Sequence, residues 1–154
     1  MKVLILEDDV LLAVLIATVV AGLYPGVSVV VTASVAAALE SWSENGADLM
    51  IIDLNLPDGS GLDVVSTVRQ SDREAAIIII SGRSDRDSIL KAAHYGISGY
   101  ISKPFDVLLL HERLVALVNP ETFQNRAPPE LDEFLRTSVE SVIQLPSAFD
   151  TGRI

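Results

Sequence analysis

The sequence of 154 residues contains no cysteine and few basic residues. Without cysteine the chain can form no disulfide framework, thiol nucleophile or zinc–thiolate site, which fits a reducing compartment. Only 11 Lys and Arg stand against 21 Asp and Glu, giving a formal net charge of -10. Because nucleic-acid binding needs basic side chains that neutralise phosphates, we expect no direct contact with nucleic acid.

Long apolar runs are lacking as well. Residues 1–6 lead straight into the acids at 7–9, which is unlike a signal peptide. Residues 10–23 are almost wholly apolar, but they fall short of the roughly 18 residues that a membrane-spanning helix needs. We therefore expect a soluble, cytoplasmic protein without membrane insertion. Hydrophobic residues still make up 49% of the chain, enough for a buried core.

Short β-branched runs alternate with longer, helix-compatible stretches. Runs such as LMII and IIII have no polar alternation, which indicates strands buried on both faces of a parallel sheet. The pattern predicts a doubly wound α/β domain of five strands with helices on both faces. The predicted strands are residues 3–6, 27–31, 49–52, 77–80 and 100–101, and the predicted helices are residues 10–22, 34–45, 62–70, 85–95 and 107–118.

The pattern changes after residue 118. Pro120, Pro128 and Pro129 predict a linker, because proline cannot propagate a helix. Apolar residues then recur at helical spacing from Leu131 to Ile143, which predicts an amphipathic helix. We expect one domain over residues 1–119 and a helical extension over residues 120–154. The extension either ends a stand-alone protein or begins a missing output domain.

Acidic residues follow two of the predicted strands. Asp8 and Asp9 come after the first strand, and Asp53 ends the third. Sites in open α/β sheets lie at the carboxyl ends of the strands, so these acids should converge. A lone pair such as Asp8 and Asp9 more often caps a helix, but Asp53 favours a shared site. Converging carboxylates repel unless a cation lies among them, and oxygen ligands suit Mg²⁺.

A hydroxyl and a lysine follow the remaining strands, at Ser81 and Lys103. A carboxylate such as Asp53 can attack phosphorus and form an acyl phosphate. Mg²⁺, an ammonium group and a hydroxyl would then stabilise the phosphoryl oxygens. The set predicts a phosphoryl-accepting site with Asp53 as the nucleophile.

Four segments resemble the response-regulator receiver family of two-component signalling, including its chemotaxis members. They are residues 4–9 (LILEDD), 51–61 (IIDLNLPDGSG), 79–82 (IISG) and 99–105 (GYISKPF). The resemblance covers about residues 1–119. It implies a flavodoxin-like fold with strand order 2-1-3-4-5.

The resemblance also implies roles for single residues. Asp53 would be phosphorylated, and Lys103 would pair with the phosphoryl group. Asp9 and Asp53 would bind Mg²⁺ together with the backbone carbonyl of Asn55, while Asp8 would act through a metal-bound water.

Further residues would act as a switch or tune the lifetime of the phosphoryl group. Ser81 would move toward a phosphoryl oxygen, and Tyr100 would follow by swinging inward. Asn55 and Arg83 occupy positions that would tune the lifetime of the phosphoryl group. The Lys103–Pro104 peptide is expected to be cis.

The implied function is a receiver that takes a phosphoryl group from a sensor histidine kinase or a histidine phosphotransfer protein. The receiver would not be an enzyme; it would catalyse only its own phosphotransfer and its own dephosphorylation. Its fourth helix, fifth strand and fifth helix would meet a downstream protein or domain, or a second copy in a homodimer.

Two alternatives remain open from the sequence. The chain could be the N-terminal regulatory part of a larger regulator whose output does not bind DNA, such as a cyclic-dinucleotide enzyme or a helical module. A Mg²⁺-dependent phosphohydrolase would use a first-strand acid as nucleophile with a second acid two residues on. Asp8 is followed two residues on by Val10, which speaks against that class.

The first predicted helix is apolar on all sides over residues 10–17. A helix that faces solvent should carry a polar stripe. We therefore expect its outer face to be covered by the phosphoryl donor, by a second copy or by the helix that follows Leu131.

Overall fold

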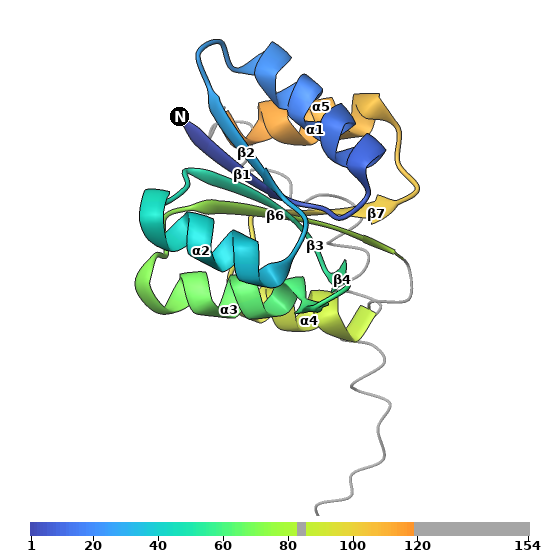
Figure 1. Ribbon diagram of the computed structural model, residues 1–154. Coiled ribbons are helices and arrows are strands. Elements are labelled where there is room, and N and C mark those ends of the chain that lie inside the picture. Colours follow the sequence, from blue (N-terminus) through green and yellow to red (C-terminus); the bar gives the residue numbers. More distant parts are fainter. Residues whose placement is uncertain (83–85, 119–154) are drawn as a thin grey trace, which may run out of the picture.

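A computed structural model describes residues 1–82 and 86–118. A parallel sheet of five strands lies between two layers of helices (Figure 1). In spatial order its strands are β2 (Ser28–Thr32), β1 (Lys2–Leu6), β3 (Leu49–Asp53), β6 (Ala76–Gly82) and β7 (Gly99–Lys103). Counted along the chain, the five sheet strands have the order 2-1-3-4-5, so the predicted doubly wound fold is confirmed.

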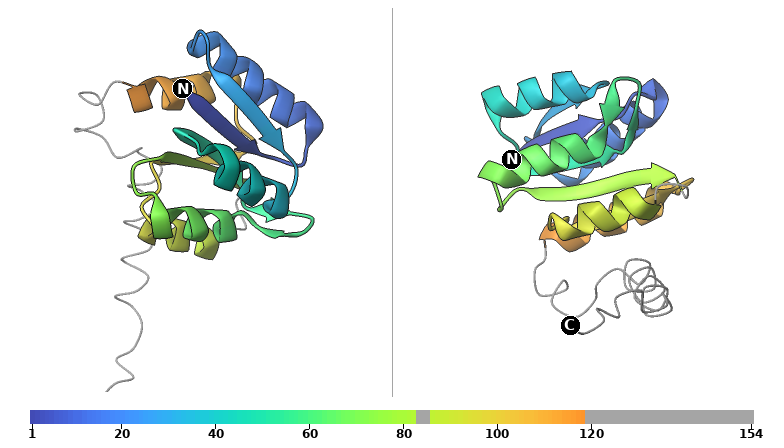
Figure 2. Two further views of the ribbon diagram at one scale, coloured as in Figure 1. Left: turned by 60° about the vertical axis from the view of Figure 1, so that its left-hand side comes forward. Right: turned by 90° about the horizontal axis from the view of Figure 1, so that it is seen from below.

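The helices divide between the two faces of the sheet (Figures 1 and 2). On one face lie α1 (Val10–Leu23) and α5 (Val107–Val118). On the other face lie α2 (Val35–Asn45), α3 (Gly61–Ser71) and α4 (Arg86–His94). Because both faces are covered, every residue of β3 is buried, as the unbroken apolar run predicted.

The element boundaries match the sequence pattern closely, with three differences. The strands β6 and β7 are each longer than the predicted residues 77–80 and 100–101. The structure also contains an antiparallel pair of two-residue strands, β4 (Asn55–Leu56) and β5 (Gly59–Ser60), which the sequence did not predict. A strand of two residues is too short to show a hydrophobic period, so the sequence pattern could not predict it.

Several predictions lie outside the described residues. They concern Arg83, the start of the helix predicted over residues 85–95, the linker after residue 119 and the helix that follows Leu131. Within residues 1–82 and 86–118, no helix has both the length and the apolar character needed to cross a bilayer.

The outer face of α1 is apolar, as the sequence predicted, and it is exposed in the structure. Leu11 is 83% exposed, and Val10, Val14 and Leu15 are exposed beside it. Ala13, Ile16 and Val20 on the opposite side of the helix are buried in the core. In the part of the chain that the structure describes, nothing covers this outer face.

Candidate functional site

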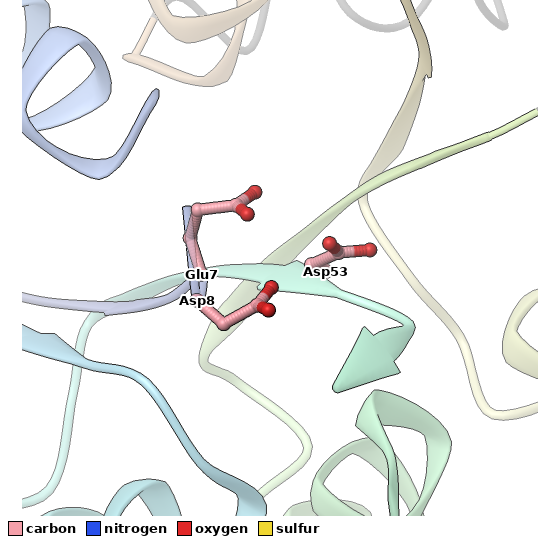
Figure 3. A group of neighbouring side chains, drawn as sticks. All are labelled: Glu7, Asp8 and Asp53. Atoms are coloured by element: carbon pink, nitrogen blue, oxygen red, sulfur yellow. The ribbon is translucent and has the colours of Figure 1, made fainter. Parts of the chain in front are cut away.

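Three carboxylates meet at the carboxyl ends of β1 and β3 (Figure 3). Glu7 and Asp8 directly follow β1, and Asp53 is the last residue of β3. The register Leu6 to Ile52 brings these strand ends side by side. Carboxylate oxygens of the three residues lie within 4.8 Å of one another. Glu7 and Asp53 are buried and Asp8 is exposed, so the group opens to solvent at one side.

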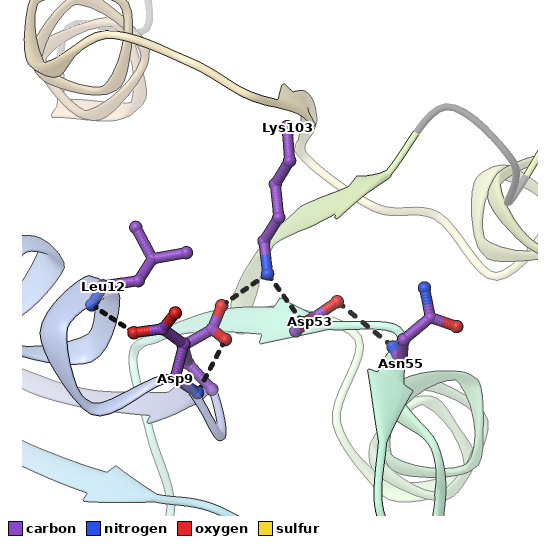
Figure 4. Close-up of polar contacts among 6 residues, drawn as sticks. Asp9, Leu12, Asp53, Asn55 and Lys103 are labelled. Carbon is purple, nitrogen blue, oxygen red and sulfur yellow. Dashed lines mark hydrogen bonds and ion pairs between the residues drawn. The ribbon is translucent and has the colours of Figure 1, made fainter.

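Asp9, predicted as a metal ligand, is not in this group. Its Oδ1 accepts a hydrogen bond from the backbone N–H of Leu12 at 3.0 Å, so Asp9 caps the N-terminus of α1 (Figure 4). The structure thus brings Glu7, rather than Asp9, together with Asp8 and Asp53. The physical reason is that the residue directly after the strand still points into the site, whereas Asp9 already begins the helix.

Lys103 joins two of the three acids. It ends β7, and its Nζ lies 2.7 Å from Asp53 Oδ2 and 2.8 Å from Glu7 Oε2 (Figure 4 shows the contact with Asp53). Its side chain reaches past the end of β6, which separates β7 from β3 in the sheet. The predicted approach of Lys103 to Asp53 is thus present before any phosphorylation.

The electrostatics of the group leave negative charge in excess. Burial raises the pKa of the Glu7 carboxyl, and the hydrogen bond from Lys103 only partly opposes this. For Lys103, burial acts to lower the pKa, but the hydrogen bonds with Asp53 and Glu7 outweigh it and the pKa is raised. One ammonium group thus faces three carboxylates. A hard divalent cation with oxygen ligands fits this set, because it would offset the remaining charge.

The loop that follows β3 is held by hydrogen bonds at Asn55 and at Asp58. The backbone N–H of Asn55 donates to Asp53 Oδ1 at 3.1 Å, so the two oxygens of Asp53 have different partners (Figure 4). Asp58 accepts from the N–H groups of Val35 and Ala36 at the start of α2, and these bonds lower its pKa. Asp58 thus caps the start of α2, and its bonds hold the loop of Asn55 against this helix.

The two predicted switch residues lie beside the acids and are already buried. Ser81, on β6, is fully buried one residue beyond Ile80, which pairs with Asp53. Tyr100, on β7, is 7% exposed and belongs to the core cluster with Ile89 of α4. The inward position expected of Tyr100 only after phosphorylation is therefore present here. The Lys103–Pro104 peptide is cis, as predicted.

Gly61 brings the start of α3 against the backbone of the site. A Cβ at this position would collide with the carbonyl oxygen of Asp53 and with Cγ2 of Ile52. The N–H of Gly61 donates to the carbonyl oxygen of Leu54 at 3.0 Å. Only glycine allows α3 to begin this close to the strand that carries Asp53.

Fold and site together define a class. A doubly wound sheet that holds a buried aspartate at the end of its central strand, with a lysine on that aspartate and two acids beside it, is the architecture of a regulatory phosphoacceptor domain. The model of the response regulator receiver domain matches residues 3–115. The chain belongs to this family.

Individual relatives agree with the family model. The chain is 31% identical to the transcriptional regulatory protein CitT of Halalkalibacterium halodurans, over 97% of this chain and 69% of CitT. It is 35% identical to the transcriptional regulatory protein KdpE of Mycobacterium tuberculosis, over 70% of this chain and 46% of KdpE. The chain thus spans less than half the length of KdpE.

Solved receiver domains share the fold. The receiver domain of the regulator TorR, of the trimethylamine N-oxide (TMAO) respiratory system, is 30% identical, with a TM-score of 0.67 over 76% of this chain and 95% of TorR's. A response regulator of Chloroflexus aurantiacus is 28% identical, with a TM-score of 0.64 over 73% of this chain and 93% of the other. Receiver domains are regulatory phosphoacceptors that bind Mg²⁺ at an acidic pocket, and the cluster of Glu7, Asp8 and Asp53 is compatible with such a pocket.

Proposed function

We propose that Asp53 accepts a phosphoryl group from the phosphohistidine of a sensor kinase or phosphotransfer protein. An oxygen of Asp53 forms the new P–O bond while the N–P bond of the donor breaks, and the leaving imidazole takes up a proton. The observation that carries this proposal is the position of Lys103 Nζ, 2.7 Å from a buried Asp53 with two further acids beside it. The receiver unit is proposed to span residues 1–119.

We assign the Mg²⁺ site to Glu7, Asp8 and Asp53 with the backbone carbonyl of Asn55. Oxygen atoms alone make up this set, which matches the preference of Mg²⁺. The ion would supply positive charge to the phosphoryl oxygens. The chain's own contribution is to keep Glu7 and Asp53 buried and to hold the Asn55 loop in place through Asp58.

Lys103 changes its partner when Asp53 is phosphorylated. Phosphorylation removes the negative charge of the Asp53 carboxylate, so the ammonium group turns to the phosphoryl oxygens, and the hydroxyl of Ser81 joins them. These contacts favour one of two arrangements of Tyr100 and of the surface made by α4, β7 and α5. That surface is proposed to bind the output protein or domain, or a second copy. Autodephosphorylation resets the state, at a rate tuned by Asn55 and Arg83.

The donor is proposed to dock on the exposed side of α1 nearest the site. Leu11 and Leu15 of α1 and Phe105 beside Lys103 line an open groove of about 420 Å³. The groove combines apolar side chains with the lysine that touches Asp53, so a helical donor bound there would bring its phosphohistidine to the site.

The output is proposed to be regulation of transcription through a partner or a further domain. The relatives CitT and KdpE are transcriptional regulators by name. With a net charge of -10, residues 1–154 themselves offer little to a phosphate backbone. The regulator with a non-DNA-binding output, one of the alternatives left open by the sequence, is the competing proposal.

The proposal is tested by intact mass after incubation with acetyl phosphate. Wild type with Mg²⁺ should gain one phosphoryl group that is stable to acid and labile to base. Asp53→Asn should gain none, and chelation of Mg²⁺ should abolish the adduct on wild type. An equal adduct on Asp53→Asn, or turnover of a generic phosphomonoester, would contradict the proposal.

Glu7→Gln is expected to increase the stability of the metal-free protein and to weaken Mg²⁺ binding. Burial disfavours the charge of Glu7, so the isosteric amide should raise the stability of the metal-free protein, by about 0.5–2 kcal/mol. The same change removes a carboxylate from the proposed Mg²⁺ site and should weaken Mg²⁺ binding about tenfold or more. Thermal unfolding and a Mg²⁺ titration check the two effects. Asp9→Asn is the control, and its Mg²⁺ affinity should stay near that of wild type.

A further inference from the structure

The outer edge of β2 is an unprotected strand edge. β2 lies at one end of the sheet and β7 at the other (Figure 1). Its sequence SVVVT has no charged residue and no proline, and Val30 and Val31 are 38% and 47% exposed. Proteins usually protect edge strands with charges, prolines or bulges, because unpaired backbone groups invite another strand. β2 has no such charge or proline.

The hydrogen bonds to β1 fix which residues of β2 face outward. The N–H of Ser28 donates to Met1 and the carbonyl of Thr32 accepts from Glu7, each at 3.0 Å. In a parallel ladder, alternate residues direct both backbone groups to the same neighbour, so 28, 30 and 32 face β1. Val29 and Val31 therefore direct their N–H and C=O groups to the free edge. Among residues 1–82 and 86–118, no strand pairs with that edge.

Charge distribution points to a second copy as the occupant. Residues 10–39 contain no Asp, Glu, Lys, Arg or His, although the chain carries a net charge of -10. This segment comprises α1, β2 and the beginning of α2. Two copies of so acidic a chain repel least where neither presents charge. β2 itself carries no charged residue; Glu7 and Asp8 line the groove on one face, and Lys2 lines the hollow on the other.

Hollows flank the strand on both faces. Between α1 and β2 lies an open groove of about 670 Å³, lined by small and apolar residues that include Ala17, Ala21 and Val31. On the other face Val30 lines a smaller hollow of about 130 Å³ with Ser41 of α2. A strand added at this edge can therefore place side chains on either face without displacing a helix.

We propose that two copies of this chain pair their β2 edges in antiparallel fashion about a two-fold axis at Val30. Val29 then lies opposite Val31 of the second copy, and both direct their backbone groups to each other, which makes about four hydrogen bonds over the two such pairs. Ser28 lies opposite Thr32 of the second copy, so the sequence SVVVT matches itself. The two sheets become continuous.

The proposed contact does not involve Asp53 or Lys103, although Glu7 and Asp8 line one part of the groove beside β2. It lies at the opposite edge of the sheet from β7 and leaves the surface of α4, β7 and α5 open. Pairing at β2 is expected in the unphosphorylated protein and does not require the function proposed for Asp53.

Single cysteines test the register, because the chain has none of its own. On the axis, the Cα atoms of Val30 in the two copies would be ~4.5 Å apart, within the range of about 4.4–6.8 Å that a disulfide spans. The two copies of Val31 would be offset along the strands and lie roughly 8 Å apart. Val30→Cys should form a covalent dimer under mild oxidation, and Val31→Cys should not. Equal cross-linking of both variants, or none of Val30→Cys, overturns the proposal.

Sedimentation equilibrium of the full chain gives an independent test. Wild type should show a concentration-dependent dimer. Val31→Pro should be monomeric, since it removes an N–H that faces outward and spares the ladder to β1. Leu108→Lys, at an exposed apolar site on α5, should leave the dimer unchanged. A monomeric wild type, or a dimer that survives Val31→Pro but not Leu108→Lys, contradicts the proposal. Circular dichroism checks that Val31→Pro is folded. If it is not, the comparison of Val30→Cys with Val31→Cys decides whether the β2 edges pair.

Discussion

Lys103→Ala should reduce the rate of phosphorylation by acetyl phosphate about 10²- to 10³-fold. The ammonium group of Lys103 lies 2.7 Å from the proposed nucleophile and is the cation placed to meet the incoming phosphoryl oxygens. Without it, charge that develops on those oxygens would lose the ammonium group that lies closest to Asp53 among the described residues. The rate is measured by intact mass over time at saturating Mg²⁺.

The affinity for Mg²⁺ distinguishes this effect from unfolding. Lys103 competes with a metal ion for Glu7 and Asp53, so its removal should leave Mg²⁺ binding unchanged or tighter. Lys91→Ala, an exposed position on α4, serves as the matched control and should phosphorylate at the wild-type rate. Wild-type phosphorylation by Lys103→Ala would contradict the assigned role, and loss of Mg²⁺ binding would indicate a damaged site instead.

Gly61→Ala should destabilise the protein by about 3 kcal/mol or more. The added Cβ would overlap the carbonyl oxygen of Asp53 and the side chain of Ile52, and neither belongs to a flexible surface group. Relief requires that α3 or β3 shift, which would also displace Asp53. Chemical denaturation measures the change in the free energy of unfolding.

Gly22→Ala is the matched control for this change, and it should act with the opposite sign. Gly22 lies in the last turn of α1, and a Cβ there would meet nothing within 4 Å. Alanine at this position should stabilise the protein by about 0.5–1 kcal/mol, because glycine loses more backbone freedom in a helix. Equal effects of the two substitutions would show that the contact of Gly61 with Asp53 does not limit stability.

The sequence predicted the fold well because its signals are strong and local. The apolar runs of β3 and β6 indicated strands buried on both faces, and Ser34, at the start of the predicted helix 34–45, caps α2. The segment after β3 was harder, because its two short strands depend on the turn at Pro57 and Asp58 rather than on a hydrophobic period.

The structure brings Asp53 and Lys103 together, the two residues that the sequence placed at the site, whereas at the first strand Glu7 rather than Asp9 joins Asp8. Three acids in a row left the choice of pair to the exact end of β1. Asp9 stands three residues before Leu12, at the distance of a helix cap, and this spacing could have identified Glu7 and Asp8 as the site pair. The position of the Tyr100 ring depends on its packing against α4, which no local pattern contains.

The central claim is that Asp53, and no other acid, takes the phosphoryl group. Borohydride reduces an acyl phosphate to the alcohol, so it converts a phosphorylated aspartate to homoserine, which peptide mass spectrometry can locate. After incubation with acetyl phosphate and Mg²⁺, we predict homoserine at position 53 alone. Homoserine at Asp8 or Asp9 would contradict the account and would favour a nucleophile on the first strand, as in a phosphohydrolase.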